Sequence, residues 1–335
     1  MTPILIAVIL SALVFDFLNG VHDSSNVVAT MISSRAMSPR AALGMTAFAN
    51  FIGPFIFGVA VAETIGNEIV SPYAINELVL LAALLSAILW NLLTWYLGFP
   101  SSSSHALIGG LIGAVVIEAG WQAIELQGLT KVVITLFTSP FIGYLVGFLF
   151  LKFIILLSWN ASPRINSFFK RGQIFSSLAL ALSHGTNDAQ KTMGIITLAL
   201  VTAGYMKVFV VPTWVIFLCA SMIALGTALG GWRLIRTLGG KFYKIRPVDG
   251  FAAQSASACV ILGASLIGGP VSTTQVVSSS IMGVGAADRV NKVRWGVAKE
   301  IASAWLFTIP ATALVGAGLY WALARILTYF AIYHH

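Results

Sequence analysis

Long apolar runs recur from one end of the sequence to the other, and they are the feature that most restricts its fold. The first covers about residues 3–34, the last about residues 293–328, and no hydrophilic stretch between them is long enough to form a separate soluble domain. An α-helix needs about 20 apolar residues to cross the hydrocarbon core of a bilayer. Only 9% of the residues are charged, against about 25% in soluble domains. The sequence therefore predicts an all-α integral membrane protein that lies in a lipid bilayer.

Most basic residues lie in short segments between these runs. Short loops rich in Lys and Arg mark the cytoplasmic side of a membrane protein. The segment from Glu63 to Glu77 is acidic and is predicted to lie outside. This distribution predicts a multi-pass protein of the plasma or inner membrane with both termini outside. It also explains the net charge of +8, so no nucleic-acid partner is expected. The basic segments contain Arg35 and Arg40; Arg164, Lys170 and Arg171; Arg233, Arg236, Lys241, Lys244 and Arg246; and Arg289, Lys292 and Arg294.

The apolar runs follow the same order in the two halves of the chain. Each half has a long segment, a span, two arms joined by a turn that contains Pro, and a last span. The segments that flank the first pair of arms are both acidic, so each pair is predicted to enter and leave from one side as a re-entrant helical hairpin. The expected ranges are 3–34, 41–62, 76–98, 105–117 and 131–157 in the first half, and 173–203, 212–231, 250–268, 275–286 and 293–328 in the second.

Two motifs support an internal duplication. Residues 19–26 align with residues 184–191, and residues 100–105 align with residues 270–275, in the same order along the chain. Each half crosses the membrane an odd number of times, so the two halves must have opposite orientations, as in many secondary transporters. We expect two inverted-topology repeats, 1–160 and 173–335, joined by a cytoplasmic linker at 161–172.

Asp23 and Asp188 occupy equivalent positions midway along their long segments. An ionisable group costs several kcal/mol in hydrocarbon, which makes it a functional candidate by default. Each Asp has a Gly and short polar residues beside it, a pattern that predicts an interrupted helix lining a cavity. The oxygens of Asp23, Asn26, Asn187 and Asp188 are suited to a coupling cation, either Na⁺ or a relayed H⁺, with Asn26 and Asn187 as candidate Na⁺ ligands. The alternative is that these groups only form hydrogen bonds between helices.

The turns between the arms contain a different kind of site. After each Pro, a run of hydroxyl side chains opens a helix: Ser101, Ser102, Ser103 and Ser104 in the first half, and Ser272, Thr273 and Thr274 in the second. A helix N-terminus presents unpaired N–H groups and a partial positive charge, which favour an anion. Two such tips facing each other would enclose a tetrahedral oxyanion. The alternative is ordinary capping of the two helices by Ser and Thr.

Other polar residues are less informative. Ser104 and His105 have the side chains of a nucleophile and its base, but neighbours on one helix do not face each other. No orienting acid is evident, so a membrane-embedded hydrolase is disfavoured and no catalytic residue is expected. Lys191 is left open between contacting an anion and neutralising Asp188. Asp16 is left open between facing a cavity and pairing locally.

The sequence resembles the PiT family of inorganic phosphate transporters. The resemblance rests on Gly-Val-His-Asp-Ser-Ser-Asn at 20–26, on Ser-His-Gly-Thr-Asn-Asp-Ala-Gln-Lys-Thr-Met-Gly at 183–194, on both hairpin turns and on residues 295–311. It implies a fold of two inverted repeats, often dimeric, that cotransports phosphate with Na⁺ or H⁺ and has no other cofactor. Val21 and His22 stand where the family usually has Ala-Asn.

The resemblance also implies roles for individual residues. The signature residues of the family are matched by Asp23, Asn26, Asn187, Asp188 and Gln190. Glu63 resembles an acidic residue that the family has after its second span. The implied phosphate ligands are Asp23, Ser102, Ser103, Ser104, Asp188, Gln190, Ser272, Thr273 and Thr274.

The sequence thus predicts a symporter of inorganic phosphate that works by alternating access. Sulfate is the nearest rival substrate, because it has the same tetrahedral shape. It lacks the proton that monobasic phosphate keeps at neutral pH, so an acceptor such as Asp23 or Asp188 favours phosphate. A passive anion channel is a third alternative, which inverted repeats with broken helices fit less well than they fit a carrier.

Overall fold

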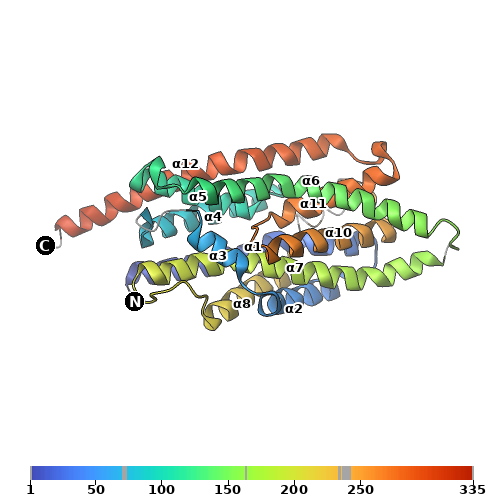
Figure 1. Ribbon diagram of the computed structural model, residues 1–335, viewed down its shortest axis with the longest axis horizontal. Helices are drawn as coiled ribbons and strands as arrows, with labels where there is room; N and C mark the ends of the chain where they lie inside the picture. The colour runs from blue at the N-terminus through green and yellow to red at the C-terminus, as the bar shows by residue number, and fades with distance from the viewer. Residues whose placement is uncertain (1, 70–73, 163, 233–234, 236–242, 334–335) are drawn as a thin grey trace.

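The computed structural model describes residues 2–69, 74–162, 164–232, 235 and 243–333, and its elements are helices (Figure 1). The long helices are α1 (Pro3–Ser33), α6 (Leu126–Leu157), α7 (Ile165–Thr202) and α12 (Trp295–Tyr333). The others are α2 (Pro39–Phe57), α3 (Ala60–Asn67), α4 (Glu77–Leu97), α5 (Ser103–Ala119), α8 (Thr213–Leu229), α10 (Pro247–Leu266) and α11 (Thr273–Asp288), with short 3-10 helices at Trp121–Ala123 and Val290–Lys292.

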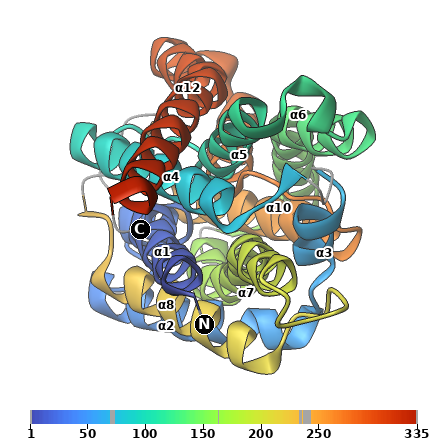
Figure 2. The same ribbon diagram turned by 90° about the vertical axis from the view of Figure 1, so that its left-hand side faces the viewer.

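The helices α1 and α7 pack against each other inside the bundle. In the end-on view α2 and α8 lie on one side of them, and α4, α5, α6 and α12 lie on the other (Figure 2). Both chain ends lie at one end of the molecule, and the connections α1–α2, α6–α7 and α11–α12 lie at the opposite end (Figure 1). Those connections contain basic segments, so the arrangement agrees with the expected grouping of loops. Arg233, Arg236 and Lys241 lie outside the described residues.

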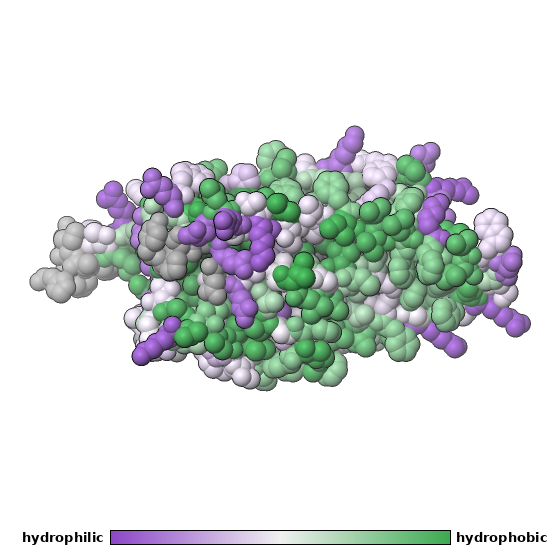
Figure 3. Space-filling model, in the orientation of Figure 1, coloured by the Kyte–Doolittle hydropathy of each residue, from purple (hydrophilic) through white to green (hydrophobic). Residues whose placement is uncertain are grey.

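The outer surface is apolar. Among the described residues, five helices are long and apolar enough to cross a membrane: α1, α2, α4, α6 and the part of α12 up to Tyr329. Large apolar side chains such as Phe141 and Leu314 are 76% and 77% exposed. Hydrophobic residues cover the middle of the molecule, and hydrophilic ones gather toward its two ends (Figure 3). This surface and the helix lengths are those of a multi-pass membrane protein.

Two helical hairpins approach each other from opposite ends of the molecule (Figure 1). The first is α4–α5 and the second is α10–α11, and their turns contain Gly98 and Gly268 at φ 73° and 72°, a conformation that favours glycine. The hairpin tips touch, because Ser104 Oγ donates a hydrogen bond of 3.2 Å to the Val271 carbonyl and His105 Nδ1 lies 2.9 Å from Gln275 Nε2. The helix pairs predicted around both turns are confirmed; the inverted relation of the halves stays a prediction.

Each hairpin packs mainly on a helix from the other half of the chain. The helix α5 packs on α12, and α11 packs on α6. The two halves are therefore interleaved, and neither would bury its own hairpin alone. The helix α7 begins at Ile165, so it extends through most of the expected linker at 161–172.

The expected interruptions of α1 and α7 at Asp23 and Asp188 are absent, because both helices run through these residues without a break. The two serine hydroxyls that follow Asp23 form hydrogen bonds within their own helix, so they do not interrupt it. The Ser24 hydroxyl donates to the Val21 carbonyl at 2.8 Å, and the Ser25 hydroxyl donates to the His22 carbonyl at 3.1 Å. A break occurs instead at Gly58, at φ 81°, between α2 and α3. The expected single span at 41–62 is therefore two helices, α2 and α3.

The crossing of α1 and α8 depends on glycine. A Cβ atom on Gly226 would lie 2.0 Å from the Phe17 carbonyl oxygen, and one on Gly20 would lie 2.3 Å from the Ile223 carbonyl oxygen. Close backbone contact through small residues is a common way to join helices in membranes. Either substitution would force the two helices apart.

Gly226→Ala is therefore expected to destabilise the protein by about 1–3 kcal/mol, the usual cost of overpacking a close contact. The measurement is the midpoint of thermal unfolding in detergent. Gly263→Ala on α10 is the matched control, because a Cβ there would meet nothing within 4 Å. Equal midpoints for the two variants would contradict the proposed helix contact.

Candidate functional site

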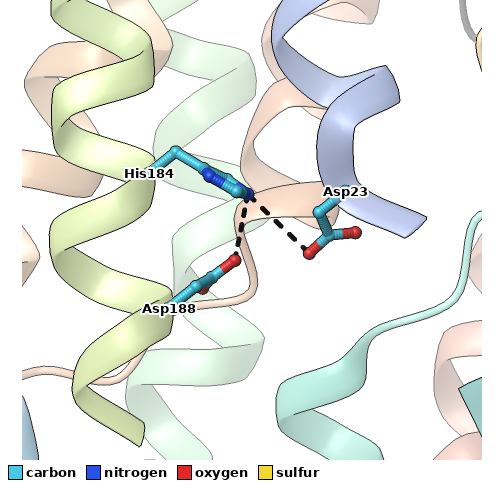
Figure 4. Close-up of side chains that lie close together, drawn as sticks. All are labelled: Asp23, His184 and Asp188. Atoms are coloured by element: carbon cyan, nitrogen blue, oxygen red, sulfur yellow. Dashed lines mark ion pairs between the residues drawn. The ribbon is translucent and has the colours of Figure 1, made fainter. Parts of the chain in front are cut away.

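Two carboxylates face each other at the centre of the bundle, Asp23 on α1 and Asp188 on α7. The His184 side chain lies between them, with Nε2 3.1 Å from Asp188 Oδ2 and 4.0 Å from Asp23 Oδ2 (Figure 4). His184 precedes Asp188 by one helical turn, which places both on the same face of α7. The three residues are at least 99% buried. Two buried carboxylates this close need positive charge or protons beside them.

The tip of the second hairpin joins the two carboxylates. Thr273 Oγ1 lies 3.0 Å from Asp188 Oδ2 and 3.3 Å from Asp23 Oδ2, so its single proton can be donated to either one. Thr274 Oγ1 donates to Asp23 Oδ1 at 2.8 Å and accepts from Asn26 Nδ2 at 3.0 Å. Asp23 and Asn26 on α1, Asp188 on α7 and the two threonines of the second hairpin therefore form one connected network.

Lys191 resolves the choice that the sequence left open. Its ammonium group forms an ion pair with Asp188 and donates a hydrogen bond of 2.9 Å to the Val271 carbonyl. The side chain is 1% exposed. Lys191 thus neutralises Asp188 in this conformation, and it also holds α7 to the tip of the second hairpin.

The first hairpin contributes its hydroxyl residues from the other end. Ser102 Oγ accepts from the His105 backbone N–H at 3.1 Å, and Ser272 Oγ accepts from the Gln275 N–H at 3.4 Å. These two residues cap α5 and α11, which is the alternative that the sequence allowed. Ser104 contacts the opposite tip, and Ser103 is buried with it. The tips therefore bring the N-termini of α5 and α11 together beside the carboxylates.

The two predicted cation ligands, Asn26 and Asn187, use their amide nitrogens and leave their oxygens without partners. Asn187 Nδ2 donates to Ser265 Oγ at 2.8 Å, and Asn26 Nδ2 donates to Thr274. Within the described part of the chain, neither Oδ1 atom has a hydrogen-bond partner, and both are buried. A buried acceptor without a partner is costly. Oxygen ligands are those that a hard cation requires, so these two atoms are suited to Na⁺.

Gln190, which the resemblance assigns to phosphate, is bonded to protein backbone. Its Oε1 accepts from the Val61 and Ala62 N–H groups at 2.7 and 3.3 Å, and its Nε2 donates to the Gly58 carbonyl at 2.7 Å. These groups flank the break between α2 and α3. Gln190 therefore satisfies the backbone of that break, where helix termini would otherwise lack partners.

Gln190→Leu is expected to destabilise the protein by about 1–3 kcal/mol, because it leaves buried backbone groups unpaired. Gln190→Glu keeps the acceptor and loses the donor, so its midpoint of thermal unfolding should fall between those of wild type and Gln190→Leu. The half-saturating phosphate concentration for uptake should change less than threefold in the Glu variant. An unchanged midpoint for Gln190→Leu with a tenfold rise in that concentration would instead show direct contact with phosphate.

Two residues of the site have no strong signal in the sequence. From the sequence alone, a histidine such as His184 is most often a packing or capping residue. In the structure, Asp23, His184 and Asp188 each offer a ligand atom within 4.8 Å of the others. Asn50 on α2 orients His184, since its Oδ1 lies 3.2 Å from His184 Nδ1 and its Nδ2 donates to Thr227 Oγ1 at 2.8 Å. In the sequence, His184 is linked to the site by the motif at 183–194 and by its spacing of four residues from Asp188, whereas no sequence signal points to Asn50. Glu63 and Glu300 are exposed and lie outside it.

The site is closed to both ends of the molecule. The site side chains on α1, α7 and both tips are no more than 3% exposed. The tip of the second hairpin contacts both carboxylates, and the tip of the first hairpin contacts the second tip. This is the geometry of an occluded compartment that would have to open before a ligand could enter.

A family model described as "Phosphate transporter family" matches residues 19–162 and 156–316 of the chain. A Bacillus subtilis (strain 168) protein, named "Probable low-affinity inorganic phosphate transporter", is 46% identical over 325 residues, which cover 96% of this chain and 97% of that protein. A Rhizobium meliloti (strain 1021) protein of the same name is 46% identical over 322 residues, which cover 96% of each. These relatives are named as transporters and not as enzymes.

A solved structure supports the same relationship. The protein described as "The sodium-dependent phosphate transporter" matches the fold with a TM-score of 0.89 and 26% identity, over 97% of this chain and 100% of that chain. The family model, the relatives and the fold agree over nearly the whole sequence. The chain therefore belongs to the phosphate transporter family.

Proposed function

We propose that the chain is a secondary transporter of the cell membrane that moves inorganic phosphate together with Na⁺ or H⁺ by alternating access. The observation that supports this most directly is the meeting of two hairpin tips, each the N-terminus of a helix, beside a buried carboxylate pair. Helix N-termini favour an anion, and Ser and Thr donate hydrogen bonds without a charge that would hold the anion permanently. The names of the relatives identify phosphate as that anion.

The carboxylates explain why a cation must accompany phosphate. Asp23 and Asp188 together have two negative charges, and Lys191 offsets only one of them. A second anion at the adjacent tips would be repelled strongly in a low-dielectric interior. A cation at Asp23, at Asn26 and Asn187, or a proton on a carboxylate or on His184, removes that repulsion. Binding of the anion and binding of the cation therefore become dependent on each other.

The hairpins supply a means of alternating access. They approach from opposite ends, so withdrawal of one tip would open the site toward one end while the other tip keeps it closed (Figure 1). The contacts that must break include Ser104 with the Val271 carbonyl and His105 with Gln275. A two-state interface of this kind is the usual basis of such transitions. A homodimer, as the resemblance implies, is compatible with the exposed apolar surfaces of α6 and α12.

The test is uptake of labelled phosphate into proteoliposomes with Na⁺ and pH gradients imposed separately. Uphill accumulation driven by one of the gradients is expected, and it would exclude a passive channel. An excess of sulfate should not reduce the uptake, since sulfate has no proton to share with Asp23 or Asp188 at neutral pH. If neither gradient drives accumulation, the symport mechanism is wrong.

A further inference from the structure

A second buried carboxylate lies on α1, away from the central site. Asp16 precedes Asp23 by about two helical turns, or about 10 Å along the axis, toward the end of the molecule where the chain termini lie. Its side chain is fully buried. Within the described part of the chain, neither of its carboxylate oxygens has a hydrogen-bond partner. No role in the central network accounts for it.

The groups around Asp16 are also polar and unsatisfied. Asn19 follows it by one turn on the same face of α1, and the Thr192 hydroxyl of α7 lies beside its carboxylate. In the described residues, both polar atoms of the Asn19 side chain and the Thr192 hydroxyl lack hydrogen-bond partners, and both residues are at least 99% buried. Apart from the approach of the Thr192 hydroxyl to the Asp16 carboxylate, the polar atoms of these three adjacent side chains are unpaired.

The charges that act on Asp16 do not neutralise it. The nearest are Asp188 and Lys191 on α7, which already pair with each other, and the Cys219 thiol on α8 has no positive charge to offer. An isolated ionised carboxylate is very costly in a protein interior. Each unpaired buried polar group adds to that cost. One cation bound among these oxygens would remove most of that cost.

The cluster is continuous with the central site. Asp16, Asn19 and Asp23 are spaced by three and four residues and share one face of α1, while Thr192, Asp188 and His184 are spaced by four residues and share one face of α7. Because α1 and α7 pack together, these two rows of polar side chains run side by side. They lead from the central carboxylates toward the terminal end of the molecule.

From this geometry we propose that Asp16, Asn19 and Thr192 form a second binding site for a monovalent cation, either Na⁺ or H⁺, on the path between the central site and the terminal end of the molecule. Asp16 supplies the charge, and the Asn19 and Thr192 oxygens supply neutral ligands for Na⁺ or hydrogen-bond acceptors for a proton bound to Asp16. Its role in coupling rests on the proposed function, whereas cation binding itself does not.

Binding is tested on the purified full-length protein in detergent, without phosphate. The midpoint of thermal unfolding is titrated with Na⁺ at constant ionic strength and fixed pH, and separately with pH in the absence of Na⁺. Asp16→Asn should shift the half-maximal response in one of the two titrations at least tenfold, and the affected titration identifies the cation. Thr192→Val, which keeps the charge, should shift the same response by a smaller factor.

Thr197→Val is the matched control, because Thr197 is another fully buried hydroxyl on α7 without a partner in the described residues and lies on a different face of that helix. It should respond as wild type does. If both Asp16→Asn and Thr192→Val give wild-type responses in both titrations, the second site does not exist. If Asp16→Asn does not fold, the response of Thr192→Val alone tests whether the second site exists.

The role in coupling is tested in proteoliposomes. Uptake driven by the identified cation should fall at least tenfold in Asp16→Asn, with a smaller loss of phosphate exchange at equal cation concentrations on both sides. Equal losses would show that Asp16 has no specific part in coupling. If wild type moves no phosphate at all, the proposed function fails, while the titrations in detergent still decide the cation site.

Discussion

Asp188→Asn is expected to reduce phosphate uptake in proteoliposomes at least 100-fold. The substitution keeps the size of the side chain and removes the charge that pairs with Lys191 and His184. A buried ion pair that loses one partner typically destabilises a protein by about 3–5 kcal/mol, because the remaining charge has no counterion. The variant should therefore lose both cation coupling and thermal stability.

A double variant separates these two effects. Asp188→Asn with Lys191→Met removes both charges, so the midpoint of thermal unfolding should recover most of the loss seen in Asp188→Asn alone. Uptake should stay at the level of the single variant, because the carboxylate beside Thr273 is still missing. Uptake near the wild-type rate in the double variant would rule out Asp188 as part of the coupling site.

Thr273→Val is the second substitution with a large expected effect. Val has nearly the same shape as Thr, but it lacks the hydroxyl that lies between Asp23 and Asp188. Without that donor the carboxylates lose their shared hydrogen bond to the hairpin tip, and the tip loses a hydroxyl donor for the anion. We expect uptake at subsaturating phosphate to fall about 30-fold, with a rise in the half-saturating concentrations of both phosphate and the driving cation.

Thr308→Val is the control for this substitution. Thr308 is a fully buried Thr of α12 whose hydroxyl donates at 2.8 Å to the Ala304 carbonyl of its own helix. Its removal should change uptake less than threefold. Similar losses in the two variants would mean that a buried hydroxyl matters for packing alone, and that Thr273 has no special contact with the transported ions.

These predictions share a physical basis. The Asp23 and Asp188 carboxylates are held in place by side chains of the second hairpin and of α7, and the tip of the second hairpin contacts the tip of the first. A change of charge on the carboxylates is therefore expected to affect the contact between the tips. Tip closure and cation binding are therefore expected to depend on each other, with a coupling free energy of about 1–3 kcal/mol as in other linked sites. Double-variant cycles between Thr273 and Asp23 would measure it.

The sequence by itself determined the helices, the two hairpins and the positions of Asp23, Asp188 and the hairpin tips. The lengths of apolar runs and the cost of a charge in hydrocarbon are local properties, and both can be read from neighbouring residues. The family resemblance was equally local, since it rested on short motifs. The matching family model and the similar relatives confirm the resemblance.

Only the tertiary structure decided how the polar side chains are used. Small and polar residues near Asp23 and Asp188 suggested broken helices, yet those helices are continuous, and the break inside an expected span lies at Gly58. The backbone at Gly58 is satisfied by Gln190, which is more than 100 residues away in the chain. His184 became part of the site because Asp23 reaches it from another helix. Hydrogen-bond partners across such distances depend on which helices pack together, and no local pattern specifies that.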